Sequence, residues 1–71
     1  MREYDIVELT CDLSERLPTG TQGTIVMVYP GQSTAFEVEF MDQGGKTIEV
    51  RSALRADQLK VVWKDATRPE F

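Results

Sequence analysis

Residues 35–41 read AFEVEFM, and this stretch decides the fold. Apolar side chains alternate with glutamates at a period of two, which is the spacing of a β-strand with one buried face and one solvated face. We therefore expect Phe36, Val38 and Phe40 to point into a core and the two intervening glutamates to point outward. The clearest signal in the chain is a half-buried strand.

Four further strands are expected around this one. Residues 4–10 (YDIVELT) and 46–51 (KTIEVR) alternate in the same way, and residues 60–63 (KVVW) form a shorter apolar run. Residues 23–29 (GTIVMVY) are rich in β-branched side chains and apolar on both faces, as a central or strongly bent strand is. The period of two thus predominates along the chain.

Turn-forming residues separate the predicted strands. Residues 11–22 form a long first loop, and Pro30 and Gly31 open a turn. The sequence DQGG at 42–45 predicts a hairpin turn in which a glycine supplies a positive φ. Residues 53–59 have the pattern of a single helical turn, too short for a stable α-helix, and we expect it to be 3₁₀.

Together these elements are typical of an all-β domain, a small, strongly bent, five-stranded SH3-like barrel with one 3₁₀ turn before the last strand. A chain of 71 residues makes one domain. We expect residues 1–63 to form the barrel and residues 64–71 a polar C-terminal tail. The predicted core consists of Val7, Leu9, Leu17, Val26, Val28, Phe36, Val38, Phe40, Ile48, Val50, Leu54, Leu59 and Val61.

The charge of the chain bears on its partners. Twelve acidic and eight basic residues give a formal net charge of −4, and the basic residues are dispersed along the sequence. Nucleic-acid binding depends on clustered lysine and arginine that neutralise phosphates, and anionic membranes attract the same clusters. The charge therefore argues against both and favours a protein partner with a basic face. The alternative is that this charge only keeps a small domain in solution.

The sequence offers little for catalysis. The chain has no histidine, the commonest general base and metal ligand, and a single cysteine, Cys11. A structural zinc site and a Cys–His nucleophile are therefore excluded, and the glycines match no phosphate-binding pattern. We expect no enzymatic activity, no metal and no cofactor. One cysteine makes no internal disulfide, and no signal-peptide or membrane-spanning run is visible, so we expect a cytoplasmic protein.

Four runs carry a family resemblance: DIVELT (5–10), LPTGTQGTIVMVY (17–29), AFEVEF (35–40) and ADQLKVV (56–62). With these runs the chain resembles a bacterial family of short proteins, domain-of-unknown-function family 4926, over nearly its whole length. The resemblance implies an SH3-like barrel and brings no catalytic residues. The same outline recurs more loosely in a small photosystem I protein, in the nitrile hydratase β-subunit domain and in KOW domains.

The candidate binding site is the outer face of the second predicted strand. If the valines of that strand point inward, Ile25, Met27 and Tyr29 point outward, with Glu37 and Glu39 beside them. An apolar patch with an acidic rim is typical of a protein-binding surface. The alternative is that strand bending, or the loop after Cys11, covers this face.

The leading functional hypothesis is a non-catalytic protein-interaction module, in the form of an antitoxin or immunity-like partner that occludes a basic protein. The first alternative is a KOW-like nucleic-acid-associated or ribosome-associated domain, against which the missing basic patch speaks. The second is a stabilising subunit of a larger enzyme or electron-transfer complex. Homodimerisation through the outer face is compatible with all three. Trp63, at the end of the last strand, is a second candidate contact residue.

Overall fold

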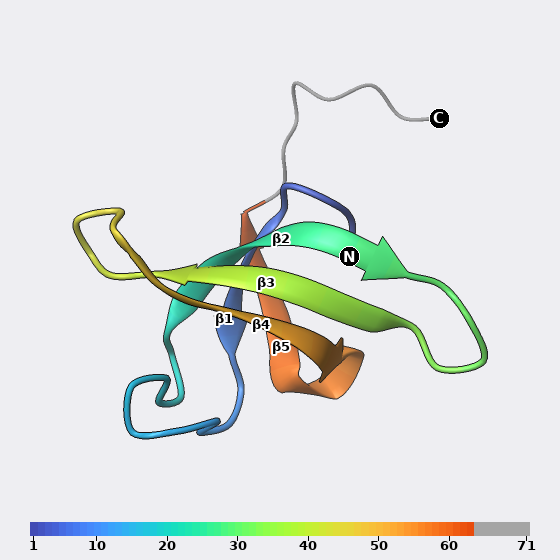
Figure 1. The fold of residues 1–71 in the computed structure, drawn as a ribbon, viewed down its shortest axis with the longest axis horizontal. Coiled ribbons are helices and arrows are strands. Elements are labelled where there is room, and N and C mark those ends of the chain that lie inside the picture. The colour runs from blue at the N-terminus through green and yellow to red at the C-terminus, as the bar shows by residue number, and fades with distance from the viewer. Residues whose placement is uncertain (64–71) are drawn as a thin grey trace.

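The computed structural model describes residues 1–63, which form a single antiparallel sheet and no α-helix (Figure 1). The strand order is β4-β3-β2-β1-β5. The elements along the chain are β1 (Ile6–Leu9), β2 (Gln22–Tyr29), β3 (Ala35–Met41), β4 (Thr47–Arg55), the 3₁₀ turn η1 (Ala56–Gln58) and β5 (Leu59–Trp63). The all-β class, the five strands and the 3₁₀ turn before the last strand are confirmed. The SH3-like assignment remains an interpretation of this arrangement.

The predicted tail, 64–71, lies outside the described residues. Within residues 1–63, no helix has the length and apolar character needed to cross a lipid bilayer.

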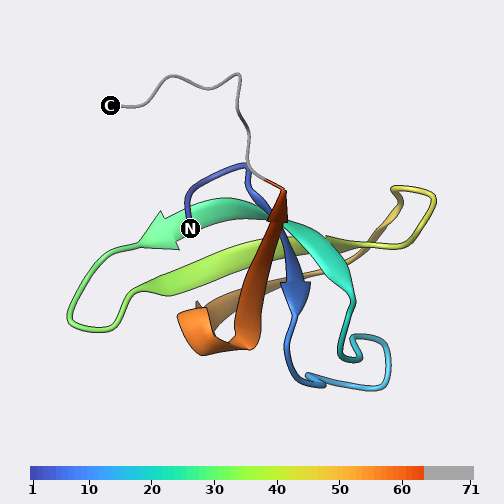
Figure 2. The ribbon, with the colours of Figure 1, turned by 180° about the vertical axis from the view of Figure 1, so that it is seen from behind.

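The sheet is sharply bent. In Figures 1 and 2, β1 and β5 lie side by side and cross β2, β3 and β4 at a steep angle. Extra residues in three strands account for the bend: the pairing register shifts at Val26 in β2, at Ile48 and again near Ala53 in β4, and at Val62 in β5. A β-bulge of this kind bends its strand and increases the local twist. At the second β4 bulge, Ala53 has a φ of 61°.

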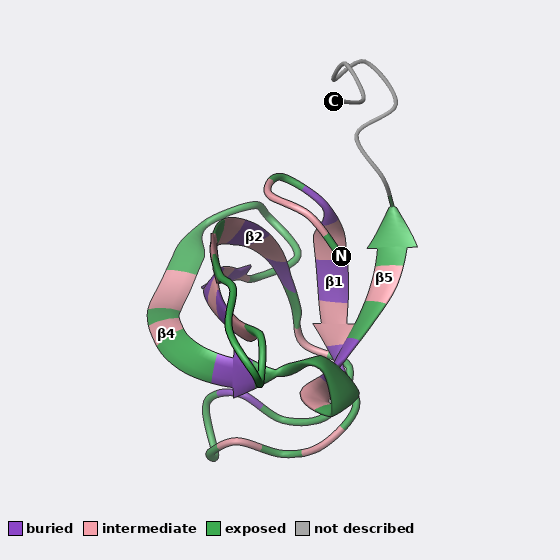
Figure 3. Cartoon of the chain, turned by 90° about the vertical axis from the view of Figure 1, so that its right-hand side faces the viewer, coloured by how far each residue is buried: buried purple, intermediate pink, exposed green. Residues whose placement is uncertain are grey.

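One apolar core lies inside the bend, and buried residues alternate with half-buried ones along β1 (Figure 3). Its nine buried members are Val7, Leu9, Leu17, Ile25, Phe36, Val38, Phe40, Leu54 and Leu59. Eight of these were predicted. Val28, Ile48 and Val61, also predicted in the core, are half-buried and pack against it. The predictions of Val26 and Val50 as core residues are wrong, because Val26 is the half-buried extra residue of the β2 bulge and Val50, opposite Glu39, is 51% exposed.

The long loop between β1 and β2 is ordered by its own hydrogen bonds around the buried Leu17. The Leu13 N–H donates to the Leu17 carbonyl at 2.9 Å, and the Gly20 N–H donates to the Leu9 carbonyl at 2.9 Å. Asp12 Oδ1 accepts from the Thr19 N–H at 2.7 Å and from the Thr19 hydroxyl at 2.9 Å. These two bonds, the backbone one first, hold the pKa of Asp12 below its ordinary value. These hydrogen bonds therefore hold the loop in place in the fold.

The hairpin turn between β3 and β4 forms where DQGG predicts it. Asp42 Oδ1 accepts hydrogen bonds from the N–H groups of Gly44 and Lys46, both at 2.9 Å. Gly45 has a φ of 81°, in the left-handed region that glycine adopts without steric cost. The side chain of Asp42 thus fixes the turn from within, as aspartate does in turns.

The 3₁₀ turn is shorter than predicted. It covers Ala56–Gln58, not 53–59, because β4 continues through the second bulge so that Leu54 reaches the core opposite Phe36. The Thr10 hydroxyl donates to the Asp57 carbonyl at 2.7 Å and ties the turn to the end of β1.

Candidate functional site

The register of β2 changes at Val26, and this change decides which of its side chains a partner can reach. Ile25 lies opposite Val38, and Met27 lies opposite Glu37, so Val26 is the extra residue between two successive pairs. Side chains alternate between the two faces of a strand, so one inserted residue moves every side chain after it to the opposite face. Before Val26 the odd-numbered side chains therefore point inward, and after it the even-numbered ones do.

The bulge corrects one predicted site residue. Ile25 is 0% exposed and belongs to the core, so the prediction that it points outward is wrong. Met27 and Tyr29, beyond the bulge, are 43% and 46% exposed, as predicted. A partner can contact the second half of β2 without disturbing the core, but it cannot contact Ile25.

The remaining predicted residues lie together on one surface. We define the outer face as the solvent side of β2, β3 and β4 that carries Met27, Tyr29, Glu37, Glu39 and Val50. Glu37 lies opposite Met27 and Glu39 lies opposite Val50, and residues paired directly across antiparallel strands share a face of the sheet. Apolar and acidic side chains therefore sit next to one another on the outer face.

Hydrogen bonds hold both glutamates of the outer face in place. The Tyr29 hydroxyl donates to Glu37 Oε1 at 3.1 Å, and the Thr47 hydroxyl donates to Glu39 Oε2 at 2.6 Å. The hydrogen bond to Glu37, together with the negative charge of that carboxylate, raises the pKa of Tyr29 above its ordinary value. Each bond engages one carboxylate oxygen, so the other can accept a donor from a partner.

Val50 is a member of the outer face that the sequence pattern places in the core. It is 51% exposed. Ile48 and Val50 are two residues apart, so plain alternation assigns them to one face. The first β4 bulge falls at Ile48, between the pairs Met41–Thr47 and Phe40–Glu49, and separates them. Only the pairing register reveals this; the β4 sequence carries no signal for it.

A row of paired residues extends the outer side of the sheet to its far edge. Trp63 lies opposite Ile6, Ile6 opposite Thr24, and Thr24 opposite Glu39. Trp63 is 52% exposed. Beside Ile6 and Trp63 an open groove of about 460 Å³ runs to Met41 and the turn at 42–45. The second candidate contact residue, Trp63, thus lines a groove.

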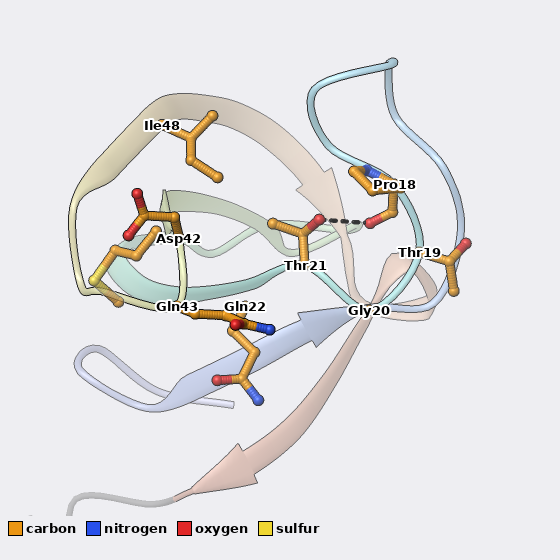
Figure 4. Close-up of a pocket in the computed structure, with 9 residues that line it drawn as sticks. Pro18, Thr19, Gly20, Thr21, Gln22, Asp42, Gln43 and Ile48 are labelled. Atoms are coloured by element: carbon orange, nitrogen blue, oxygen red, sulfur yellow. Dashed lines mark hydrogen bonds between the residues drawn. The ribbon is translucent and has the colours of Figure 1, made fainter.

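A second hollow borders the same turn and shares Gln22, Met41, Asp42 and Gln43 with the groove (Figure 4). It has a volume of about 490 Å³ and lies between residues 18–22, residues 41–43 and Ile48. The Thr21 hydroxyl donates to the Pro18 carbonyl at 2.7 Å on one wall. Asp42 is the only titratable residue among the described residues that line it. Its lining gives no pair of groups suited to acid–base chemistry.

The comparison with protein families matches the chain to one family. The model of the family described as "Domain of unknown function (DUF4926)" matches residues 3–61 of the 71. The chain belongs to this family. The match confirms the family resemblance of the sequence. No curated protein and no solved structure matches the chain.

The described part of this DUF4926 domain holds no group of three or more acidic or cysteine side chains arranged to bind a metal ion. Cys11 is a half-buried free thiol. The strongest surface features of the domain are thus the outer face and the groove beside Trp63, and both are suited to contact with another molecule.

Proposed function

We propose that this domain is a non-catalytic protein-interaction module whose outer face binds a partner protein through a basic surface. The observation that supports this most strongly is the arrangement on β2, β3 and β4: exposed Met27, Tyr29 and Val50 stand directly beside Glu37 and Glu39. Met27 and Tyr29 lie on β2 and Val50 lies on β4, with the two glutamates of β3 between them. Exposed apolar side chains with polar neighbours mark interaction sites.

The residue types suit both the apolar contact and the electrostatic attraction of an interface. Tyrosine and methionine are enriched where proteins meet, since both bury a large apolar surface, and tyrosine also keeps a polar end. Glu37 and Glu39 stand on a strand whose other face is locked in the core, so their charges are fixed in direction. Fixed carboxylates attract a basic partner and discriminate against acidic ones.

In this proposal the domain acts by covering the partner's surface. An antitoxin or immunity-like role is one form of such occlusion, and it requires no chemistry from the domain. We also propose a cytoplasmic location, because small secreted domains usually depend on disulfides and this chain has a single cysteine, Cys11.

The test is affinity capture from a lysate of the source cells, with three versions of the tagged chain compared side by side. The first two versions are the wild type and Met27→Glu, which places a negative charge at the centre of the outer face. Gln32→Glu, at an exposed position of the β2–β3 loop, adds the same charge away from that face and serves as the control. Circular dichroism and thermal melting verify that all three are folded.

We expect one protein to be recovered with the wild type and with Gln32→Glu, and to be lost with Met27→Glu. The reason is that a buried, unpaired carboxylate in the contact costs more than the extra charge contributes by steering. Rising salt concentration should weaken the capture, because the attraction between the carboxylates and the basic partner is screened. Equal recovery with all three chains would exclude the outer face as the binding surface.

A further inference from the structure

The groove beside Trp63 combines an apolar wall with a polar end. Its apolar wall is formed by Ile6, Met41, Val62 and Trp63, and its polar end by Gln22, Asp42, Gln43 and Gly45. Val62 is the extra residue of the β5 bulge, opposite the Ile6–Val7 step, and the bulge places Trp63 opposite Ile6. The fold thus brings an indole ring and a carboxylate to the same open groove from opposite edges of the sheet.

The carboxylate of Asp42 uses one oxygen within the turn and leaves the other available to accept a hydrogen bond. Its Oδ1 accepts from the N–H groups of both Gly44 and Lys46 at 2.9 Å, which anchors the carboxylate in the turn. Among residues 1–63 no donor is hydrogen-bonded to Oδ2. Neither Lys46 nor Lys60, the nearest basic residues along the two strands, lines the groove. Among residues 1–63, no basic side chain forms an ion pair with Asp42.

We propose that this groove is the socket for an arginine side chain of the partner protein, with the guanidinium lying against Trp63 and hydrogen-bonded to Asp42. A planar guanidinium stacks on an aromatic face, and its fork of N–H donors fits a carboxylate and nearby amide oxygens. The methylene groups of arginine would lie along Ile6 and Val62. An ammonium group fits less well, because it is a compact, strongly hydrated charge without a planar face.

The charge of the domain supports this occupant. The chain carries a net charge of −4, and the row Trp63–Ile6–Thr24–Glu39 connects the groove to the acidic outer face. The socket deepens the proposed function and rests on it for the source of the arginine, since a partner that approaches the outer face with a basic surface brings such side chains to the groove.

The test is a titration of the ¹⁵N-labelled chain with Nα-acetyl-arginine amide, followed by NMR. Nα-acetyl-citrulline amide, which has the same shape without the charge, is the control ligand. We expect saturating shifts at the indole N–H of Trp63 and at the side-chain amides of Gln22 and Gln43. Citrulline should bind about five- to tenfold more weakly, as expected when a charge-assisted hydrogen bond becomes a neutral one. Equal shifts with both ligands, or none at these groups, would overturn the socket.

Two variants test whether the charge of Asp42 and the ring of Trp63 contribute to arginine binding. Asp42→Asn keeps a side-chain oxygen for the N–H groups of Gly44 and Lys46 but removes the charge, and Trp63→Leu keeps an apolar side chain but removes the ring. Each should weaken arginine binding about fivefold or more. The control is Glu15→Gln, an equal change of net charge at an exposed loop residue that does not line the groove.

If Glu15→Gln weakens binding as much as Asp42→Asn does, the attraction is a general effect of the acidic chain and the socket is wrong. Wild-type affinity in Asp42→Asn would also contradict it. Because the titration needs no partner protein, its outcome is separate from that of the capture experiment on Met27.

Discussion

The two halves of β2 differ in every property that matters for binding, although they belong to one strand. In Gln22–Ile25 the chain is held between β1 and β3, and Gly23 and Ile25 are buried. In Val26–Tyr29 the pairing with β3 continues, but Met27 and Tyr29 stand in solvent. The sequence GTIVMVY hardly distinguishes them, because both halves are apolar. The single extra residue, Val26, separates core from surface.

A bulge can therefore change which side chains of an apolar strand reach solvent. At Val26 the odd-numbered side chains of β2 pass from the core to the solvent side, whereas Val28 beyond it packs against the core. We therefore expect mutation of Ile25 to act through stability, and mutation of Met27 or Tyr29 to act through local electrostatics and, under the proposed function, through binding.

The largest expected effect is a difference in stability between substitutions at Ile25 and at Val26, which are neighbours at the β2 bulge. Ile25→Ala should reduce the free energy of unfolding by about 2–5 kcal/mol, because it leaves a cavity in the core. Val26→Ala, at a half-buried position outside the core, should cost clearly less than Ile25→Ala. Urea denaturation of both variants measures the two values. Equal losses would mean that the bulge does not separate buried from exposed side chains.

A smaller effect is expected at Gly23, where the first half of β2 lies closest to its neighbour. A Cβ at this position would meet Val38 Cγ1 at 2.6 Å and the Glu39 carbonyl oxygen at 2.7 Å. Because a backbone atom cannot move aside easily, Gly23→Ala should destabilise the domain by about 1–3 kcal/mol, as overpacked cores do. The control is Gly31→Ala, since a Cβ there meets no atom within 4 Å. A thermal melt in which both variants behave alike would contradict the close packing.

The smallest effect is electrostatic and belongs to the second half. Since the folded chain raises the pKa of Tyr29 above 10.0, the neutral phenol is the favoured form. This contribution to stability is complete below pH 10 and is lost as the pH rises through the raised pKa of the folded state. Glu37→Ala should lower the pKa of Tyr29, followed by the ¹³Cζ shift of the ring. Glu39→Ala, whose carboxylate binds Thr47 instead, should leave it raised; the reverse result would show that Glu37 is not the cause.

Much of the fold could be predicted from the sequence, because much of it is local. The alternation in 35–41 gives β3 with both faces assigned correctly, and DQGG gives the 42–45 turn because only that combination supplies both a turn-fixing aspartate and a glycine for positive φ. Val7 and Leu9 are likewise buried as their alternation predicts.

What could not be predicted depends on how the strands pair. The sequence pattern places Ile25 and Val50 on the wrong faces and Val26 in the core, and each of the three lies at, next to or beyond a register shift between two strands. A bulge leaves no mark in a strand that is apolar on both sides, because either assignment then looks equally hydrophobic. Of the predicted site, Met27, Tyr29, Glu37 and Glu39 therefore lie together as expected, whereas Ile25 does not belong to it.

The change of faces at Val26 is tested most directly by the accessibility of single thiols on either side of the bulge. In a Cys11→Ser background, Ile25→Cys and Met27→Cys each place one thiol at a defined position of β2, and the rate of reaction with a water-soluble disulfide reagent under native conditions reports its exposure. We predict rapid reaction for Met27→Cys and, for Ile25→Cys, reaction only as fast as the domain unfolds. Equal rates, or faster reaction at position 25, would contradict the account.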